Sequence, residues 1–183
     1  MVNSNFENAA VLVSLIEALR EHGHCGNTHI QKSMFFIQEI SEFEDPYPFV
    51  LYKHGPYSFT LKEDLSAFLS YRFLDIAIPD NSTVQYSNGP QADMLKQKFW
   101  GKAKRYEACI NFVAEKLGPK DVRHLEKLST ALFFLNHRPM KEEEIARKIH
   151  ELKPHISLED AENSIKLAKE LLLEGKNYNP LSS

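Results

Sequence analysis

Residues 48–69 decide the fold, and they read PFVLYKHGPYSFTLKEDLSAFL. Residues 49–52 are apolar and rich in β-formers, so they predict a short strand. Gly55 and Pro56 then predict a sharp turn, and residues 58–71 carry apolar side chains at helical spacing. The segment therefore predicts a strand, a turn and an amphipathic helix in succession.

The helix predicted over 58–71 begins with a capping signature, because Glu63 follows Thr60 by three residues. Its apolar side, which we expect to be buried, holds Leu61, Leu65, Phe68 and Leu69. Its opposite face carries Lys62, Glu63, Ser66 and Ser70.

Two helices are predicted before this segment, over 5–22 and 28–41, because apolar residues recur there at helical spacing. After it, apolar alternation over 73–78 and 84–86 on either side of a Pro-Asp-Asn-Ser turn predicts a β-hairpin. Three helices followed by a hairpin is the order of a winged helix. We therefore predict a winged-helix-like domain over residues 1–90, with a short strand and a hairpin wing.

An Asn-Gly-Pro sequence marks a boundary at residue 90, and no strand pattern follows it. Residues 91–183 are predicted to form an all-helical domain, with helices over 91–117, 121–136, 141–152 and 157–174. The sequence leaves open whether Gly101 breaks the first of these helices. The tail from Gly175 is expected to fray. The predicted class is mainly α with a small β component.

Composition indicates an ordinary soluble protein. The chain has 183 residues, of which 43% are hydrophobic and 26% charged, so it can bury a core without a disulfide or a metal. Its two cysteines fit a reducing compartment. The first residues lack the pattern of a signal peptide, and no apolar run reaches about 20 residues. We therefore expect a cytoplasmic protein without a membrane segment.

The net charge of −3 hides an asymmetry between the two halves. Residues 1–90 hold 5 Lys and Arg against 11 Asp and Glu, whereas residues 91–183 hold 17 against 14. The half that resembles a DNA-binding fold is therefore the acidic half.

No catalytic or cofactor motif stands out. The His-Gly-His-Cys-Gly-Asn-Thr-His sequence at 22–29 offers four potential zinc ligands, but it lacks the spaced second pair of a structural site. We interpret it as a polar turn and predict no metal and no cofactor. Cys25 and Cys109 have no nucleophile-elbow or phosphate-loop pattern around them, so we predict a protein that is not an enzyme.

DNA binding is the first functional hypothesis. A recognition helix needs donors for base edges and cations for phosphates, and the helix over 58–71 offers Thr60, Lys62, Ser66 and Ser70. The predicted wing tip at 79–83 has no Lys or Arg. The backbone contacts would then come from the basic side of the helix over 91–117, which carries Lys96, Lys98, Lys102, Lys104 and Arg105. The alternative for that side is a solvated helix face.

A protein interface is the second hypothesis, because aromatic residues crowd the turn and are enriched in interface cores. The candidates for direct contact are Tyr47, Phe49, Tyr52 and Tyr57. Several of the neighbouring aromatic residues are expected to lie in the core instead. The long helix over 91–117 could also pair with its own copy, so we expect a homodimer.

Several motifs resemble known families. The first is QKSMFF at 31–36, followed by HGPYS at 54–58 with Leu61, Asp64 and Leu65. The second is LEKLSTA at 125–131, followed by Glu144-Ile145 and LKPHIS at 152–157. Together they resemble the YwgA-like bacterial and archaeal proteins, although His54 stands where that group has tyrosine. More distantly, the first half resembles the SocA-like antitoxin domain, also called Panacea.

The resemblance implies a winged-helix-type N-terminal domain followed by a helical one, and the antitoxin-like part implies a protein-binding role. Two functions remain open at this point. One is a non-enzymatic winged-helix regulator that binds DNA as a dimer. The other is an antitoxin-like or adaptor-like protein-interaction module that uses the same fold without DNA contact.

Overall fold

The computed structural model describes residues 2–78 and 84–180. Within them the chain is 69% helix and 8% strand, which confirms the predicted mainly α class. The elements are α1 (Val2–His22), α2 (Asn27–Ser41), β1 (Val50–Tyr52), β2 (Gly55–Tyr57), α3 (Phe59–Ser70), β3 (Leu74–Ala77), β4 (Gln85–Asn88), α4 (Ala92–Lys98), α5 (Trp100–Leu117), α6 (Val122–His137), α7 (Glu142–Leu152), α8 (Leu158–Gly175) and the 3₁₀ helix η1 (Lys176–Tyr178). The winged-helix arrangement of the first half stays a prediction.

The strand predicted at 49–52 belongs to a hairpin that the sequence did not predict. β1 pairs antiparallel with β2, with Tyr52 opposite Gly55 and Leu51 opposite Pro56. The two residues between Tyr52 and Gly55 therefore make the turn. Gly55 and Pro56, which we predicted to be the turn, form the start of the second strand.

The cap of α3 also differs from the prediction. The N-cap is Ser58, whose hydroxyl accepts a hydrogen bond from the Leu61 backbone N–H at 3.2 Å. Thr60 lies in the first turn of the helix instead. At the start of the helix predicted over 157–174, Ser157 is the N-cap of α8, and its hydroxyl accepts from the Asp160 backbone N–H at 3.1 Å.

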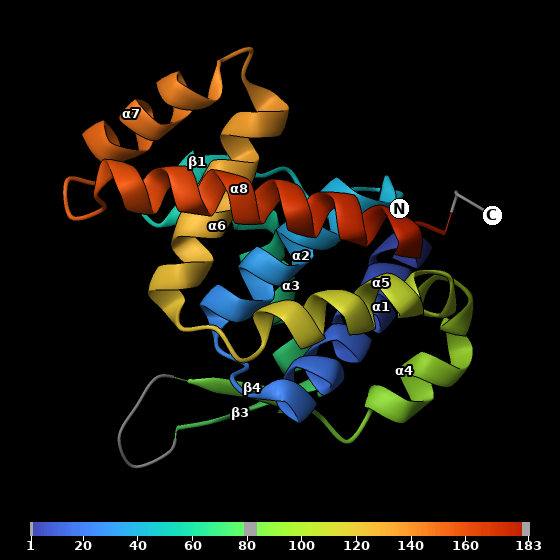
Figure 1. The fold of residues 1–183 in the computed structure, drawn as a ribbon. Coiled ribbons are helices and arrows are strands. Elements are labelled where there is room, and N and C mark those ends of the chain that lie inside the picture. Colours follow the sequence, from blue (N-terminus) through green and yellow to red (C-terminus); the bar gives the residue numbers. More distant parts are fainter. Residues whose placement is uncertain (1, 79–83, 181–183) are drawn as a thin grey trace.

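The region predicted as one helix over 91–117 is two helices. α4 ends at Lys98 and α5 begins at Trp100, with Phe99 between them in a non-helical conformation. The break therefore precedes Gly101, which lies inside α5. The two helices take different directions in Figure 1, where α4 lies below α5.

Residues 175–178, the first part of the tail that we predicted to fray, pack onto the fold. Gly175 is buried against Ile40, and η1 follows it. The Tyr178 ring stacks on Phe112 with 4.8 Å between centroids. This contact holds the start of the tail against α5.

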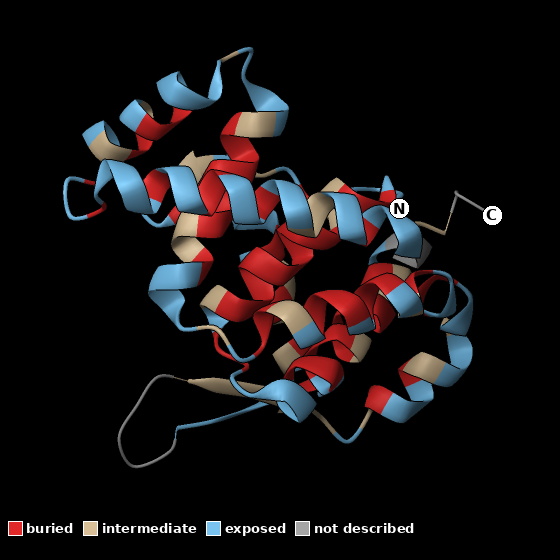
Figure 2. Ribbon diagram, in the orientation of Figure 1, coloured by how far each residue is buried: buried red, intermediate tan, exposed pale blue. Residues whose placement is uncertain are grey.

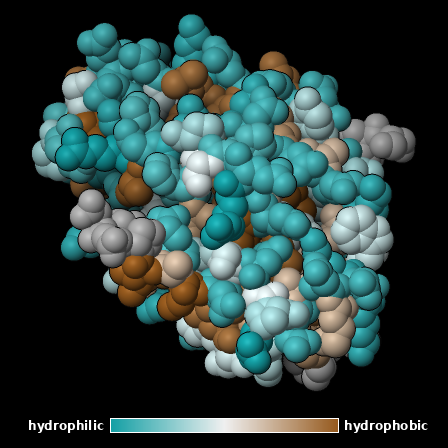
Figure 3. Space-filling view, turned by 90° about the horizontal axis from the view of Figure 1, so that it is seen from below, coloured by the Kyte–Doolittle hydropathy of each residue, from teal (hydrophilic) through white to brown (hydrophobic). Residues whose placement is uncertain are grey.

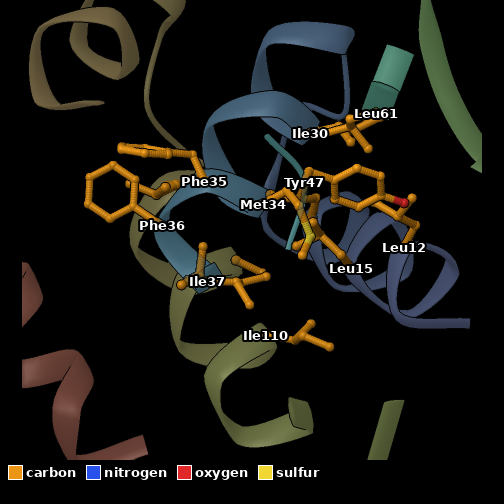
Figure 4. Close-up of a cluster of buried hydrophobic side chains, with 14 of the residues drawn as sticks. Leu12, Leu15, Ile30, Met34, Phe35, Phe36, Ile37, Tyr47, Leu61 and Ile110 are labelled. Atoms are coloured by element: carbon orange, nitrogen blue, oxygen red, sulfur yellow. The ribbon is translucent and has the colours of Figure 1, made fainter. Parts of the chain in front are cut away.

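The core lies where the helices cross (Figures 1 and 2). α1 lies beside α5, and α2 contacts both α5 and α6, while α6, α7 and α8 pack on one another. Figure 4 shows α2 at the centre, with Met34 and Ile37 among Leu12, Leu15 and Ile110. Residues from both sides of residue 90 share this cluster of buried side chains. The division into two domains stays a prediction.

None of the helices in the described residues is long and apolar enough to span a lipid bilayer.

Candidate protein-interaction surface

The outer face of the β1–β2 hairpin carries a cluster of exposed apolar side chains. We call Val50, Tyr52, Tyr57 and Phe59 the aromatic surface. Val50, Tyr52 and Phe59 are 48%, 56% and 49% exposed, and Tyr57 is half-buried. The three rings lie mutually close, with centroid separations of 5.2–5.8 Å. Contiguous exposed apolar groups of this kind mark interaction sites on soluble proteins.

Strand alternation separates the two faces of the hairpin. Val50, Tyr52 and Tyr57 point outward, because Val50 and Tyr52 are two residues apart and Val50 lies opposite Tyr57. Leu51 and Pro56 point to the other face, where Pro56 is buried. The hairpin therefore shows its aromatic residues to solvent while its other face lies on the protein.

α2 holds the inner face through two neighbouring side chains. The Gln31 amide makes two hydrogen bonds to the backbone of Ser58, donating to its carbonyl and accepting from its N–H, both at 2.9 Å. The Lys32 ammonium donates to the Pro56 carbonyl at 2.7 Å. These bonds give the Pro56 carbonyl and the Ser58 N–H partners that they would otherwise lack, whereas the Ser58 carbonyl also accepts from the Lys62 N–H at 3.2 Å.

Lys32 is 2% exposed, an unusual position for a lysine. Burial lowers the pKa of its amine to about 8, and the nearby Glu126 carboxylate opposes that shift. A lysine is thus fixed in the interior as a hydrogen-bond donor to the hairpin.

α6 supports the tip of the hairpin. The His54 ring nitrogen Nδ1 lies 2.8 Å from the Glu126 carboxylate, which also pairs with the buried Lys153 at 3.3 Å. Gly55 has φ +88°, and a Cβ there would lie 2.8 Å from the Thr130 hydroxyl. Glycine is needed because the backbone conformation disfavours a side chain and α6 leaves no room for one.

These contacts bring together the segments on which the family resemblance rests. Gln31 and Lys32 come from QKSMFF at 31–36, His54 and Pro56 from HGPYS at 54–58, and Glu126 from LEKLSTA at 125–131. Far apart in sequence, they meet at the base of one hairpin. The sequence indicated each segment but not that they touch.

Of the four predicted interface residues, Tyr47 is buried and Phe49 packs against the core. Tyr47 is 4% exposed and donates its hydroxyl proton to Asp64 at 2.9 Å. Burial, with the Asp64 charge next in size, raises the pKa of the Tyr47 hydroxyl well above its usual value. Phe49 is half-buried against Phe35, with ring centroids 5.2 Å apart. Aromatic character alone did not separate core from surface here.

Val50 and Phe59 are members of the aromatic surface that we did not select from the sequence. The spacing offered a signal for both. Val50 lies two residues before Tyr52 on the strand, and Phe59 lies two residues after Tyr57, at the first position of α3.

The DNA-contact candidates on α3 all reach solvent. Thr60, Lys62, Ser66 and Ser70 are all exposed, as is the acidic Glu63. The Ser66 hydroxyl donates to the Lys62 carbonyl and the Ser70 hydroxyl to the Ser66 carbonyl, both at 3.2 Å. Both hydroxyl protons are therefore used by the helix itself. The predicted wing tip at 79–83 lies outside the described residues.

Lys102 is not on the basic side where we expected it. It is 6% exposed, and its ammonium donates to the Asn8 side chain and to the Glu44 carbonyl, both at 2.8 Å. Its ammonium also lies 4.6 Å from the centre of the Phe43 ring. Burial lowers the pKa of Lys102, although acidic neighbours, Asp45 first among them, oppose this. The prediction that Lys102 contacts a phosphate is therefore wrong, because its charge is held inside the fold.

Three of the other four basic residues pair with carboxylates of the same chain. Lys96 bonds to Glu17 at 2.7 Å, and Lys104 and Arg105 bond to Glu107 and Glu44 at 2.5 Å. Lys98 is exposed, and its ammonium lies 5.6 Å from the Phe99 ring centroid. The basic side that sequence alone suggested is largely balanced by neighbouring acids.

The polar turn at 22–29 does not assemble a metal site. In the part of the chain that the structure describes, no group of three His, Cys, Asp or Glu side chains is placed to hold a metal ion. His29 is buried and its Nε2 lies 2.9 Å from the Lys120 carbonyl. Burial raises the pKa of the Cys25 thiol to about 12.

Comparison with protein-family models finds no match for this chain, and a search of curated proteins finds none either. The resemblance to the YwgA-like group and to the SocA-like antitoxin domain therefore stays a prediction. The case for function rests on the chain's own geometry.

Proposed function

We propose that this chain is a non-enzymatic protein-interaction module whose contact surface is the aromatic surface. One observation carries the proposal. A hairpin anchored by buried hydrogen bonds presents Val50, Tyr52 and Tyr57 on its outer face, next to Phe59 at the start of α3. The partner is a polypeptide that covers these side chains with apolar groups of its own.

The energetics of interfaces favour this surface. Tyrosine and other large aromatic residues dominate binding energy when they are buried at the centre of an interface, and a single one contributes about 2 kcal/mol or more. The anchoring by Gln31 and Lys32 fixes the backbone before binding, so little ordering remains to oppose association. Exposed Lys53 and Thr60 beside the surface supply polar groups for a rim.

The DNA-binding regulator is the weaker of the two candidates. Backbone phosphates dominate DNA affinity and require unpaired cations. In the described residues, Lys96, Lys104 and Arg105 are paired with acids and Lys102 is buried. The exposed face of α3 offers Lys62 next to Glu63, which gives no net positive charge.

Affinity capture with matched variants tests the proposal. The tagged full chain is expressed in its native host as wild type, as a Tyr52→Ser/Phe59→Ser double variant, and as a Leu173→Ser control, and captured proteins are quantified by mass spectrometry. Leu173 is 70% exposed on α8, so the control also removes an exposed apolar side chain. Melting curves verify that all three proteins are folded.

We expect one protein captured in near-equal amount by wild type and control and lost from the double variant. Retention of every captured protein by the folded double variant contradicts the proposal. The purified proteins are also mixed with random duplex DNA at about 50 and 200 mM salt, where binding through phosphates falls steeply. Salt-sensitive DNA binding that the double variant keeps would establish the regulator instead.

A further inference from the structure

The outer edge of β3 carries a second exposed apolar segment, away from the aromatic surface. The four residues 75–78 are all exposed, and Ile76 and Ile78 are 48% and 69% exposed. The predicted alternation over 73–78 places both isoleucines on the same side as Leu74, and of the three only Leu74 is buried. Figure 3 shows apolar surface next to the grey residues between β3 and β4. Residues 76–78, at the end of β3 and just after it, are three consecutive exposed apolar residues, and such a run is unusual unless it has a function.

The direction of the backbone groups on β3 follows from the bonds of β4. Tyr86, which lies opposite Ile76, donates its N–H to the Cys25 carbonyl at 2.8 Å, and its own carbonyl accepts from Arg20 at 3.3 Å. Both groups therefore point away from β3, so Ile76 and Tyr86 form a non-hydrogen-bonded pair. The Ile76 N–H and C=O must then point to the outer edge.

The neighbouring bonds agree with this alternation. The Phe73 carbonyl accepts from the Gly89 N–H at 2.8 Å. The backbone N–H and C=O groups of the odd-numbered residues of β3 therefore point toward β4. Within residues 2–78 and 84–180 the sheet consists of β3 and β4 alone. The outer edge of β3 therefore carries a backbone donor and acceptor at Ile76 that pair with no strand of the described chain.

We propose that this edge binds the same edge of a second copy of the chain, with the two β3 strands antiparallel across a two-fold axis. An exposed apolar edge is a template for another strand, and the edge of an identical copy has the matching donors, acceptors and isoleucines. An isologous contact of this kind closes on itself and stops at a dimer.

Charge selects the register. With Ile76 opposite the second copy's Ile76, the pair exchanges two backbone hydrogen bonds, and Asp75 lies opposite Ala77. In the neighbouring register, Leu74 of one copy would lie opposite Ile76 of the other. Asp75 would then lie opposite the second copy's Asp75, and facing like charges are destabilising. The register centred on Ile76 avoids that repulsion.

Sedimentation over about 1–300 µM tests whether the dimer exists. The interface is small, so we expect a reversible monomer–dimer equilibrium rather than an obligate dimer. Ile76→Asp places two carboxylates face to face at the axis and should weaken association by about tenfold or more. Leu173→Asp adds the same charge on α8 and should leave association unchanged. A wild-type monomer throughout, open-ended aggregates, or a dimer that Ile76→Asp leaves intact would each overturn the proposal.

Disulfide cross-linking tests the register. Opposed residues in a hydrogen-bonded pair have Cα atoms about 5.5 Å apart, within the range that a disulfide spans. Ile76→Cys should therefore form a covalent dimer with copper-phenanthroline as oxidant, while the native Cys25 and Cys109 are buried. Asp75→Cys would place its two sulfurs on diagonal positions and should cross-link poorly. Preferential cross-linking through Asp75→Cys would overturn this register.

Discussion

Replacing Lys32 by methionine should remove a pH dependence that the wild-type protein shows. Burial lowers the pKa of this amine from 10.5 to about 8 in the folded state. Between these two values the unfolded chain holds a proton that the folded chain has released. Raising the pH through this window therefore favours the folded state, and the gain is absent below about pH 8, where both states are protonated.

The size of the effect follows from the two pKa values. At about 1.4 kcal/mol per unit of pKa, the full difference corresponds to about 3 kcal/mol, and about 2 kcal/mol of it accrues between pH 7 and 9.5. Methionine has a similar length but no charge. It relieves the burial of the ammonium but leaves the Pro56 carbonyl without its donor, which costs about 1–3 kcal/mol. The difference in free energy of unfolding between wild type and Lys32→Met should therefore change with pH, even where that difference is small at neutral pH.

Urea unfolding followed by circular dichroism, at several values between about pH 7 and 9.5, measures the difference. The free energy of unfolding of wild type should rise relative to that of Lys32→Met by about 2 kcal/mol across this range. Contributions from the buried thiols Cys25 and Cys109 are common to both proteins and cancel. Lys62→Met, on the exposed face of α3, controls for the loss of a lysine. Parallel profiles for wild type and Lys32→Met would refute the reasoning.

Three further stability predictions use melting or urea unfolding. Gly55→Ala should lower the free energy of unfolding by about 2–4 kcal/mol, because φ is positive there and the new Cβ clashes with the α6 hydroxyls. Gly101→Ala meets no atom within 4 Å and should raise the free energy of unfolding by up to about 1 kcal/mol through its higher helix propensity. Gln31→Leu should lower the free energy of unfolding by about 1–3 kcal/mol, because the buried Ser58 N–H loses its partner while the Ser58 carbonyl keeps the Lys62 N–H; a cost below 1 kcal/mol would contradict the anchoring role. Lys102→Met should cost about 2 kcal/mol or more and Lys98→Met within about 0.5 kcal/mol, whereas equal costs would contradict the burial of Lys102.

The helices could be predicted because their signal is local. Apolar spacing of three and four residues is a property of a short stretch of sequence, and so are the caps, such as Ser157 at the start of α8. The β1–β2 hairpin escaped prediction because each strand has three residues. The sequence pattern predicted Pro56 in a turn. Proline is tolerated in β2 because the residue opposite Leu51 donates no backbone hydrogen bond to β1.

The site residues depended on contacts between distant segments. Lys102 has the periodicity of a polar helix face, but Asn8 and Glu44, more than fifty residues away in sequence, draw it inside. Tyr47 is buried because Asp64 supplies a partner for its hydroxyl. No pattern around either residue reports those partners. Tyr52 and Tyr57 were predicted as contact residues, and they are the two of the four candidates that the hairpin presents outward.

Photo-crosslinking in the native host tests most directly whether the aromatic surface is where this protein meets its partner. A benzoylphenylalanine replaces Tyr52 in one protein and Leu173, on exposed α8, in another. Our account predicts a discrete cross-linked protein band from position 52 under ultraviolet light and none from position 173. The same band from both positions, or cross-links from position 173 alone, would contradict the assignment of the hairpin as the contact surface.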